Sequence, residues 1–96
     1  MPRAIWNNRT IADAPLNNIQ RVEGNIYFPP SAVKREFLRP SASRTHCPWK
    51  GEASYYNVEV DGMVSEDAAW YYPEPSTAAA NIKNYIAFWH GVQVEE

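Results

Sequence analysis

The stretch YYNVEVDGMV (residues 55–64) predicts the element around which the rest of the chain is arranged. Asp61 and Gly62 divide two runs of alternating residues, and an Asp-Gly pair between such runs is the strongest short-range signal for a β-hairpin. Both residue types tolerate the positive φ angles of a tight two-residue turn. The stretch therefore predicts two antiparallel strands joined at Asp61-Gly62.

Strict pairing from this turn puts one carboxylate on an apolar face. Val60 falls opposite Met63, and Tyr56 falls opposite Asp67, so that Asp67 shares a face with Val60. A buried carboxylate needs hydrogen-bonding or charged partners. We therefore expect a β-bulge near residues 65–67, which would turn the side chain away, with a functional Asp67 as the alternative.

Other short strands are separated by similar turn signals. Asn7-Asn8 separates residues 4–6 from 10–12, and Gly24-Asn25 separates residues 19–22 from 26–28. Residues 85–89 form a further strand, and residues 92–94, after Gly91, are expected to form a terminal edge strand. The chain thus consists mainly of short strands joined by tight turns.

Two short helices are predicted between the strands. Ser31 can cap a helix over residues 32–38 that Pro40 ends, and Ser76 can cap a second over residues 77–83 that Asn84 ends. With 96 residues and no linker or repeat, the chain is predicted to be one domain, residues 1–96. The expected fold is a strand-dominated α+β domain with small twisted antiparallel sheets and two short helices.

The charge pattern excludes some partners. Nine basic and eleven acidic residues give a net charge of −2, and the longest basic run is Lys34-Arg35, so we expect no nucleic-acid partner. No apolar segment reaches the length of a membrane span, and none resembles a leader, so we expect no membrane partner. One cysteine cannot form an internal disulfide, and the expected location is cytoplasmic.

Four motifs in order identify a family resemblance: VEGNIYFP (residues 22–29), CPWKG (47–51), ASYY (53–56) and DAAWYYP (67–73). Over residues 11–94 the chain resembles the family known as domain of unknown function 427, sometimes labelled nucleotidyltransferase-like. That family resembles the small Mss4-like, or β-tent, folds, and this implies a β-tent architecture. Several β-tent domains hold zinc in two Cys-x-x-Cys knuckles, but one Cys and two His cannot, so we expect no metal and no cofactor.

Cys47 can be a reactive thiol or a small buried residue. A reactive cysteine needs a cationic neighbour or a helix N-terminus to favour the thiolate. Lys50 is the better-placed cation, because His46 is adjacent on a strand and points to the opposite face. Free cysteines are commonly buried and inert, and we expect that outcome first, with Cys47 as a catalytic nucleophile as the alternative.

Thirteen aromatic residues in 96 supply a second set of candidates. Adjacent aromatic pairs on a strand must split between its two faces, so one member can enter the core and the other can face a ligand. Glu66-Asp67 is the one acidic pair within a distinctive motif, but strand neighbours point apart. The candidate site residues are Cys47 and Asp67 for catalysis and Trp49, Lys50, Tyr55, Glu66, Trp70 and Tyr72 for ligand binding.

Two functions follow from these candidates. In the first, the domain binds a small molecule in an aromatic-lined cleft near Cys47 and Lys50, with or without catalysis. In the second, it is a non-catalytic module whose exposed aromatic face docks a protein partner or a second copy of the chain. Nucleotide transfer needs carboxylate-held magnesium and phosphate-binding donors, and no such set is assembled in the sequence.

Overall fold

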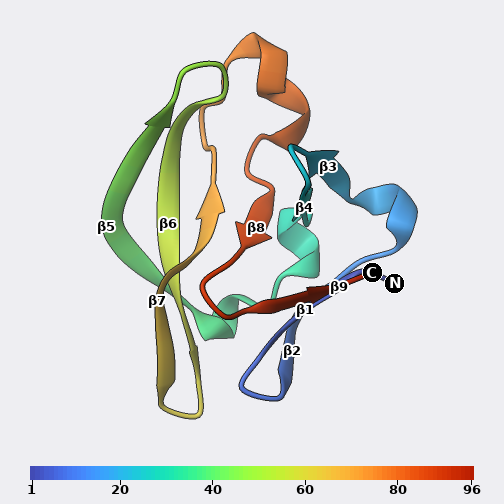
Figure 1. Cartoon of the computed structure of the whole chain (residues 1–96), viewed down its shortest axis with the longest axis vertical. Coiled ribbons are helices and arrows are strands. Elements are labelled where there is room, and N and C mark those ends of the chain that lie inside the picture. The colour runs from blue at the N-terminus through green and yellow to red at the C-terminus, as the bar shows by residue number, and fades with distance from the viewer.

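The structure, a computed structural model, describes all residues 1–96. It contains nine strands in three antiparallel sheets, in the orders β2-β1-β9, β3-β4 and β5-β6-β7-β8. The four-stranded sheet stands on one side of the molecule, and the two smaller sheets face it from the other (Figure 1). The strands are β1 (Arg3–Trp6), β2 (Arg9–Asp13), β3 (Gln20–Val22), β4 (Asn25–Tyr27), β5 (Leu38–Cys47), β6 (Gly51–Val60), β7 (Met63–Tyr71), β8 (Ile86–Phe88) and β9 (Gln93–Glu95).

The predicted hairpin of β6 and β7 is confirmed, together with its bulge. Asp61 and Gly62 form the turn with φ of 50° and 80°, and Val60 pairs with Met63. The register then shifts, so that Tyr56 pairs with Ala69. Our strict pairing of Tyr56 with Asp67 is therefore wrong beyond the bulge. Residues 66–68 of β7 lie opposite the single residue Asn57 of β6, and the left-handed Asp67 among them, with φ of 54°, has its carboxylate rotated off the apolar face.

The two smaller hairpins also form where turn residues predict them. Asn7 and Asn8 adopt positive φ between β1 and β2. In the second hairpin the turn lies one residue earlier than expected, at Glu23 and Gly24, and Asn25 already pairs with Val22. That shift places Glu23 at the tip of the β3–β4 hairpin. The terminal strand β9 is confirmed as an edge, paired only with β1.

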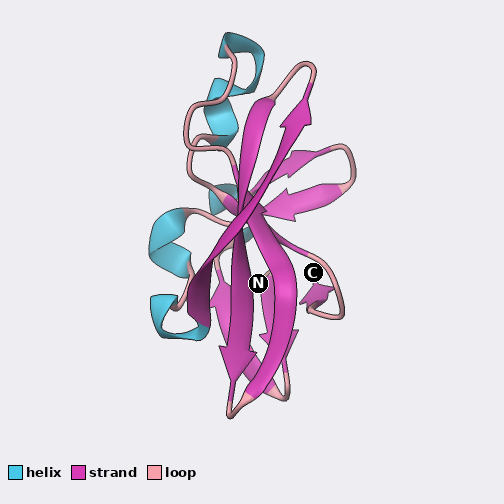
Figure 2. Cartoon of the chain, turned by 90° about the vertical axis from the view of Figure 1, so that its left-hand side faces the viewer, coloured by secondary structure: helices cyan, strands magenta, loops and turns pink.

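The two predicted helices are wrong, because only 3₁₀ turns form there. These are Pro30–Ala32, Arg35–Phe37 and Thr77–Ile82, besides one at Leu16–Asn18, and they lie along one side of the strands (Figure 2). Ala79 has non-helical angles inside the last of them. Neither helix is capped as expected, and the Ser76 hydroxyl donates to the carbonyl of Trp49 instead. Backbone bonds to neighbouring strands, such as Lys34 N–H to Ile11, outweigh local helix propensity.

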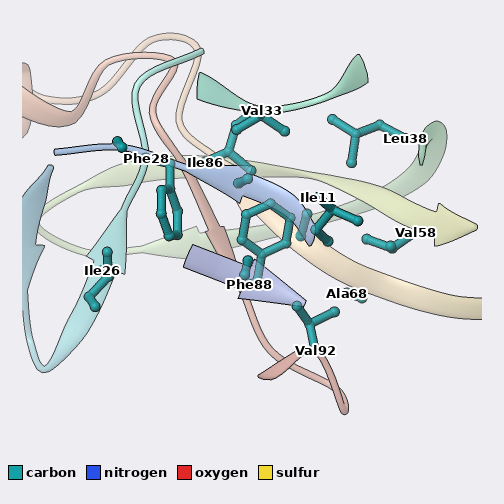
Figure 3. Close-up of a cluster of buried hydrophobic side chains, with 14 of the residues drawn as sticks. Ile11, Ile26, Phe28, Val33, Leu38, Val58, Ala68, Ile86, Phe88 and Val92 are labelled. Carbon is teal, nitrogen blue, oxygen red and sulfur yellow. The ribbon is translucent and has the colours of Figure 1, made fainter. Parts of the chain in front are cut away.

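Apolar side chains form two buried groups. The larger one, the main core, gathers side chains from every sheet, and Phe28, Phe88, Ile11 and Val58 converge within it (Figure 3). The smaller one, which we name the aromatic cluster, consists of Tyr27, Ala53, Tyr55, Trp70, Tyr72, Ala79, Ile82 and Ala87. Neighbouring aromatics split between the two faces, as predicted: Tyr55 and Trp70 enter the aromatic cluster, whereas Tyr56 and Tyr71 pack on the main core. The expectation that one member of each pair stands free of the core to face a ligand is not met, because both faces are packed.

The coarse fold class is therefore confirmed as a strand-dominated domain built from small antiparallel sheets. Among its helical turns, none has the length and apolar character needed to cross a bilayer. The candidate site lies above the aromatic cluster, where the β5–β6 and β3–β4 hairpin turns meet.

Candidate functional site

Lys50 lies in the turn between β5 and β6, and residues 74–76 run beside that turn (Figure 1). The Ser76 N–H donates to the Lys50 carbonyl at 2.9 Å, and the Ser76 hydroxyl donates to the Trp49 carbonyl. Gly51 has a φ of 112°, and a Cβ there would lie 3.3 Å from the Glu74 carbonyl. These contacts with residues 74–76 fix the backbone at the turn, and the Lys50 side chain is buried.

We expect Gly51→Ala to destabilise the protein more than Gly62→Ala does. Both glycines have positive φ, which costs an alanine about 1–2 kcal/mol, but the Gly62 position is open, whereas the Gly51 methyl meets a backbone carbonyl. Urea unfolding of the two variants measures the difference in free energy of unfolding. Equal losses would mean that residues 74–76 yield and do not fix the turn.

The Lys50 ammonium is buried between aromatic rings. The residue is 6% exposed, and its Nζ lies 5.2 Å from the ring centroid of Trp49 and 5.6 Å from that of Tyr72. Its one carboxylate partner is Glu23, at the tip of the β3–β4 hairpin, which also accepts a bond from Trp49 Nε1 at 3.3 Å. Aromatic faces attract a cation, so the rings and the carboxylate together hold the charge in a largely dry position.

Electrostatics favours the charged forms of this pair. Burial opposes the charge on Lys50, but the bond with Glu23 and the phenols of Tyr27 and Tyr72 raise the Lys50 pKa above its ordinary value. The bond from Lys50, with a smaller contribution from Trp49, lowers the pKa of Glu23. Both groups are therefore ionised at neutral pH. Lys50 can bind an anion but cannot act as a base there.

The aromatic cluster forms the floor beneath Lys50. Tyr27 is fully buried, its hydroxyl accepts a 3.1 Å bond from Trp70 Nε1, and the two rings meet edge to face at 6.1 Å. Tyr55 hydrogen-bonds Thr45 through its hydroxyl at 2.8 Å. Cys47 is half-buried and packs against the same cluster. The structure thus brings together five candidates, namely Cys47, Lys50, Tyr55, Trp70 and Tyr72, with Trp49 exposed at the rim.

Tyr72 gives the site a measurable signature in alkaline solution. Burial raises the pKa of Tyr72 to about 12, against the opposing charge of Lys50. The unfolded side chain loses its proton near pH 10, so Tyr72 contributes its full stability below that pH and loses it as the pH rises towards 12. We expect Tyr72→Phe to flatten the decline of the free energy of unfolding between pH 10 and 12, by about 2 kcal/mol at pH 12. Parallel declines in urea unfolding of both proteins would show that Tyr72 is not the group responsible.

Asp67 and Glu66 lie apart from this site, at the bulge in β7. The Asp67 carboxylate accepts bonds from the hydroxyls of Ser41 and Ser43, which lower its pKa. The backbone N–H of Asp67 donates to Asn57 Oδ1 at 2.8 Å. Glu66 is exposed, and its carbonyl lies 3.1 Å from His90 Nδ1. The Asp67 side chain therefore connects the β7 bulge to the irregular part of β5, between Pro40 and Arg44, across β6.

Two side chains of the site, Glu23 and Tyr27, were not among the sequence candidates. Both belong to the quoted motif VEGNIYFP, which places a carboxylate and a phenol four residues apart, but nothing local indicates their contact with residue 50. No enclosed pocket is present in the structure, and the buried Lys50 side chain lies against the rings of Trp49 and Tyr72. No three His, Cys, Asp or Glu side chains converge as metal ligands would.

Comparison with known proteins gives one informative result. A search of curated proteins finds no match to the chain. A family model, described as a domain of unknown function (DUF427), matches residues 2–96, nearly the whole chain. That match includes both hairpin turns and every residue of the site. The chain therefore belongs to the DUF427 family.

Proposed function

We propose that the protein binds a small molecule that carries an acidic group and an aromatic ring, with the acidic group at Lys50. One observation carries this proposal: a lysine ammonium is held against two aromatic faces, and its only carboxylate partner sits on an exposed turn. A ligand carboxylate can take the place of Glu23 without entering a pre-existing cavity.

The exchange is favourable on physical grounds. The Glu23 side chain is 53% exposed, so it regains its hydration at little cost when it leaves Lys50. Lys50 is 7% exposed by side chain and keeps its rings, so an incoming anion meets a desolvated and pre-positioned cation. Trp49 is 41% exposed and offers a flat surface beside that cation for the ring of the ligand.

The remaining candidates take different places in this proposal. Tyr72, Trp70 and Tyr55 are buried and support the site from below, with Tyr72 alone touching Lys50. Cys47 packs against the aromatic cluster and remains our candidate nucleophile for any covalent step. Asp67 and Glu66 belong to the bulge and receive no contact with the ligand. A β-tent relationship and a cytoplasmic location complete the proposal as expectations from the sequence.

Titration with three probes, followed by NMR, tests the proposal. Benzoate carries both the ring and the charge, acetate only the charge, and benzyl alcohol only the ring. We expect benzoate to bind most tightly, with saturable shifts at Trp49, Lys50 and the Glu23 turn. If benzyl alcohol bound as tightly as benzoate, the charge of the ligand would play no role. Shifts confined to other surfaces would show that the ligand does not bind at Lys50.

Protein docking is the second candidate function, and the exposure of Trp89 favours it. This ring is 44% exposed, stacks on His90 at 4.1 Å and meets Trp70 edge to face at 5.2 Å, so it is rigidly presented to solvent. Rigid exposed tryptophans are common anchors of protein interfaces. If a second copy is the partner, sedimentation should show association that Trp89→Ala weakens. If the protein stayed monomeric at millimolar concentration, self-association through Trp89 would be ruled out.

A further inference from the structure

Positive charge is concentrated in one segment of an otherwise acidic chain. Residues 34–44 contain Lys34, Arg35, Arg39 and Arg44 with Glu36 as the single acidic residue, a net charge of +3 in a chain whose total is −2. This segment runs through the 3₁₀ turn Arg35–Phe37 and into the edge strand β5. The concentration identifies a surface that attracts anions.

Two arginines of this segment have no carboxylate partner. The chain has six arginines, and Arg3, Arg9, Arg21 and Arg39 each lie within 4 Å of a carboxylate oxygen. Arg35 and Arg44 are both exposed and make only bonds to neutral groups. Their guanidinium charges are therefore available to an external anion.

These two arginines flank a stacked pair of tyrosines. The rings of Tyr56 and Tyr71 lie 4.8 Å apart with 18° between their planes. Arg35 Nη1 donates to the Tyr56 hydroxyl at 3.0 Å, and its guanidinium lies 5.9 Å from the centre of that ring. The arrangement fixes Arg35 beside one phenol of the pair.

The sheet register places Arg44 beside the other phenol. Arg44 pairs with Ser54 and Ser54 pairs with Tyr71, so the three side chains stand in one row on the same face of the sheet. Burial and the neighbouring Tyr56 raise the pKa of Tyr71, and the charge of Arg44 opposes that rise. The Tyr71 phenol therefore keeps its proton at neutral pH, and a phenol hydroxyl can donate a hydrogen bond to an anion.

We propose that Arg35, Arg44 and the hydroxyls of Tyr56 and Tyr71 form a binding site for a phosphate monoester, distinct from the Lys50 site. Guanidinium groups match the oxygens of phosphate with paired N–H donors, and the phenols add neutral O–H donors. The site lies on the main-core face of the four-stranded sheet, whereas Tyr55, Trp70 and the Lys50 site lie on the other face. The two sites can therefore be occupied together.

NMR titrations at constant ionic strength test this site, with phenyl phosphate and inorganic phosphate as the two probes. We expect saturable shifts at Tyr56, Tyr71 and the two arginines. Tighter binding of phenyl phosphate would identify an organic monoester as the ligand, and tighter binding of inorganic phosphate would correct the ligand to the free ion at the same site.

Variants of exposed arginines complete the test. In the double variant R35Q/R44Q we expect the dissociation constant for phenyl phosphate to rise at least about tenfold, because two charged donors are lost. R3Q removes an exposed arginine of another sheet, and in this variant the dissociation constant for phenyl phosphate should not change. Both variants are expected to fold, since these side chains are exposed, and K50M should bind phosphate as the native protein does. Equal affinity in R35Q/R44Q and R3Q, or no saturable binding, would overturn the proposal.

Discussion

Tyr27→Ala is expected to lower the free energy of unfolding by about 3–5 kcal/mol, as removal of a fully buried aromatic ring usually does. Tyr27 has no exposed surface and lies at the centre of the aromatic cluster, where its ring meets Trp70 edge to face. Alanine would leave a cavity directly beneath Lys50 and take away the hydroxyl that accepts the Trp70 N–H. Urea unfolding followed by tryptophan fluorescence measures the loss.

Tyr27→Phe separates the two contributions of this side chain. Phenylalanine keeps the ring but leaves the Trp70 N–H without its acceptor, and an unpaired buried donor costs about 1–3 kcal/mol. The phenylalanine variant should therefore retain most of the stability that the alanine variant loses. If both variants lost the same amount, the hydrogen bond and not the ring would dominate, and our description of the aromatic cluster as a packed floor would be wrong.

Lys50→Met is expected to weaken benzoate binding at least about tenfold, because it removes the only buried cation at the two turns. Methionine has a similar length and fills the space between Trp49 and Tyr72. Glu23 is half-exposed and stays hydrated when its partner is lost, so no buried charge is left unpaired. Stability should therefore change far less than affinity does.

Lys83→Met is the matched control for this prediction. Lys83 is exposed, follows the 3₁₀ turn Thr77–Ile82 and forms no ion pair. Its replacement changes the net charge by the same amount and should leave benzoate binding unaltered. A similar loss of affinity in both variants would mean that benzoate responds to overall charge and that Lys50 forms no specific site.

Turn chemistry explains why the strands were predictable from the sequence. Asn7-Asn8 and Asp61-Gly62 occupy left-handed conformations that few residues tolerate, so these turns are fixed locally. The bulge at Asp67 was also predictable, because a carboxylate in strict register would have been buried. The absence of the helix expected at residues 32–38 was not predictable, because the backbone of residues 33–34 bonds to β2 and that tertiary pairing overrides the local preference.

The candidate site was predictable only in part. Cys47, Trp49 and Lys50 share one turn, and the alternation of β6 and β7 correctly places Tyr55 and Trp70 on a common face. Glu23 lies 27 residues from Lys50 along the chain, and their contact depends on how the β3–β4 hairpin packs on the sheet. The separation of Asp67 from Lys50 depends likewise on the register shift in β7. Neither the Glu23–Lys50 contact nor the separation of Asp67 from Lys50 can be read from the local sequence.

The affinity of benzoate for Glu23→Gln, compared with the native protein, is the measurement we would make first. Glutamine keeps the size of the side chain but removes the charge that competes for Lys50, and exposed ion pairs contribute up to about 1 kcal/mol. Our proposal predicts that benzoate binds this variant about two- to fivefold more tightly. Unchanged or weaker binding would show that the ligand does not displace Glu23 and would contradict the assignment of Lys50 as the anion site.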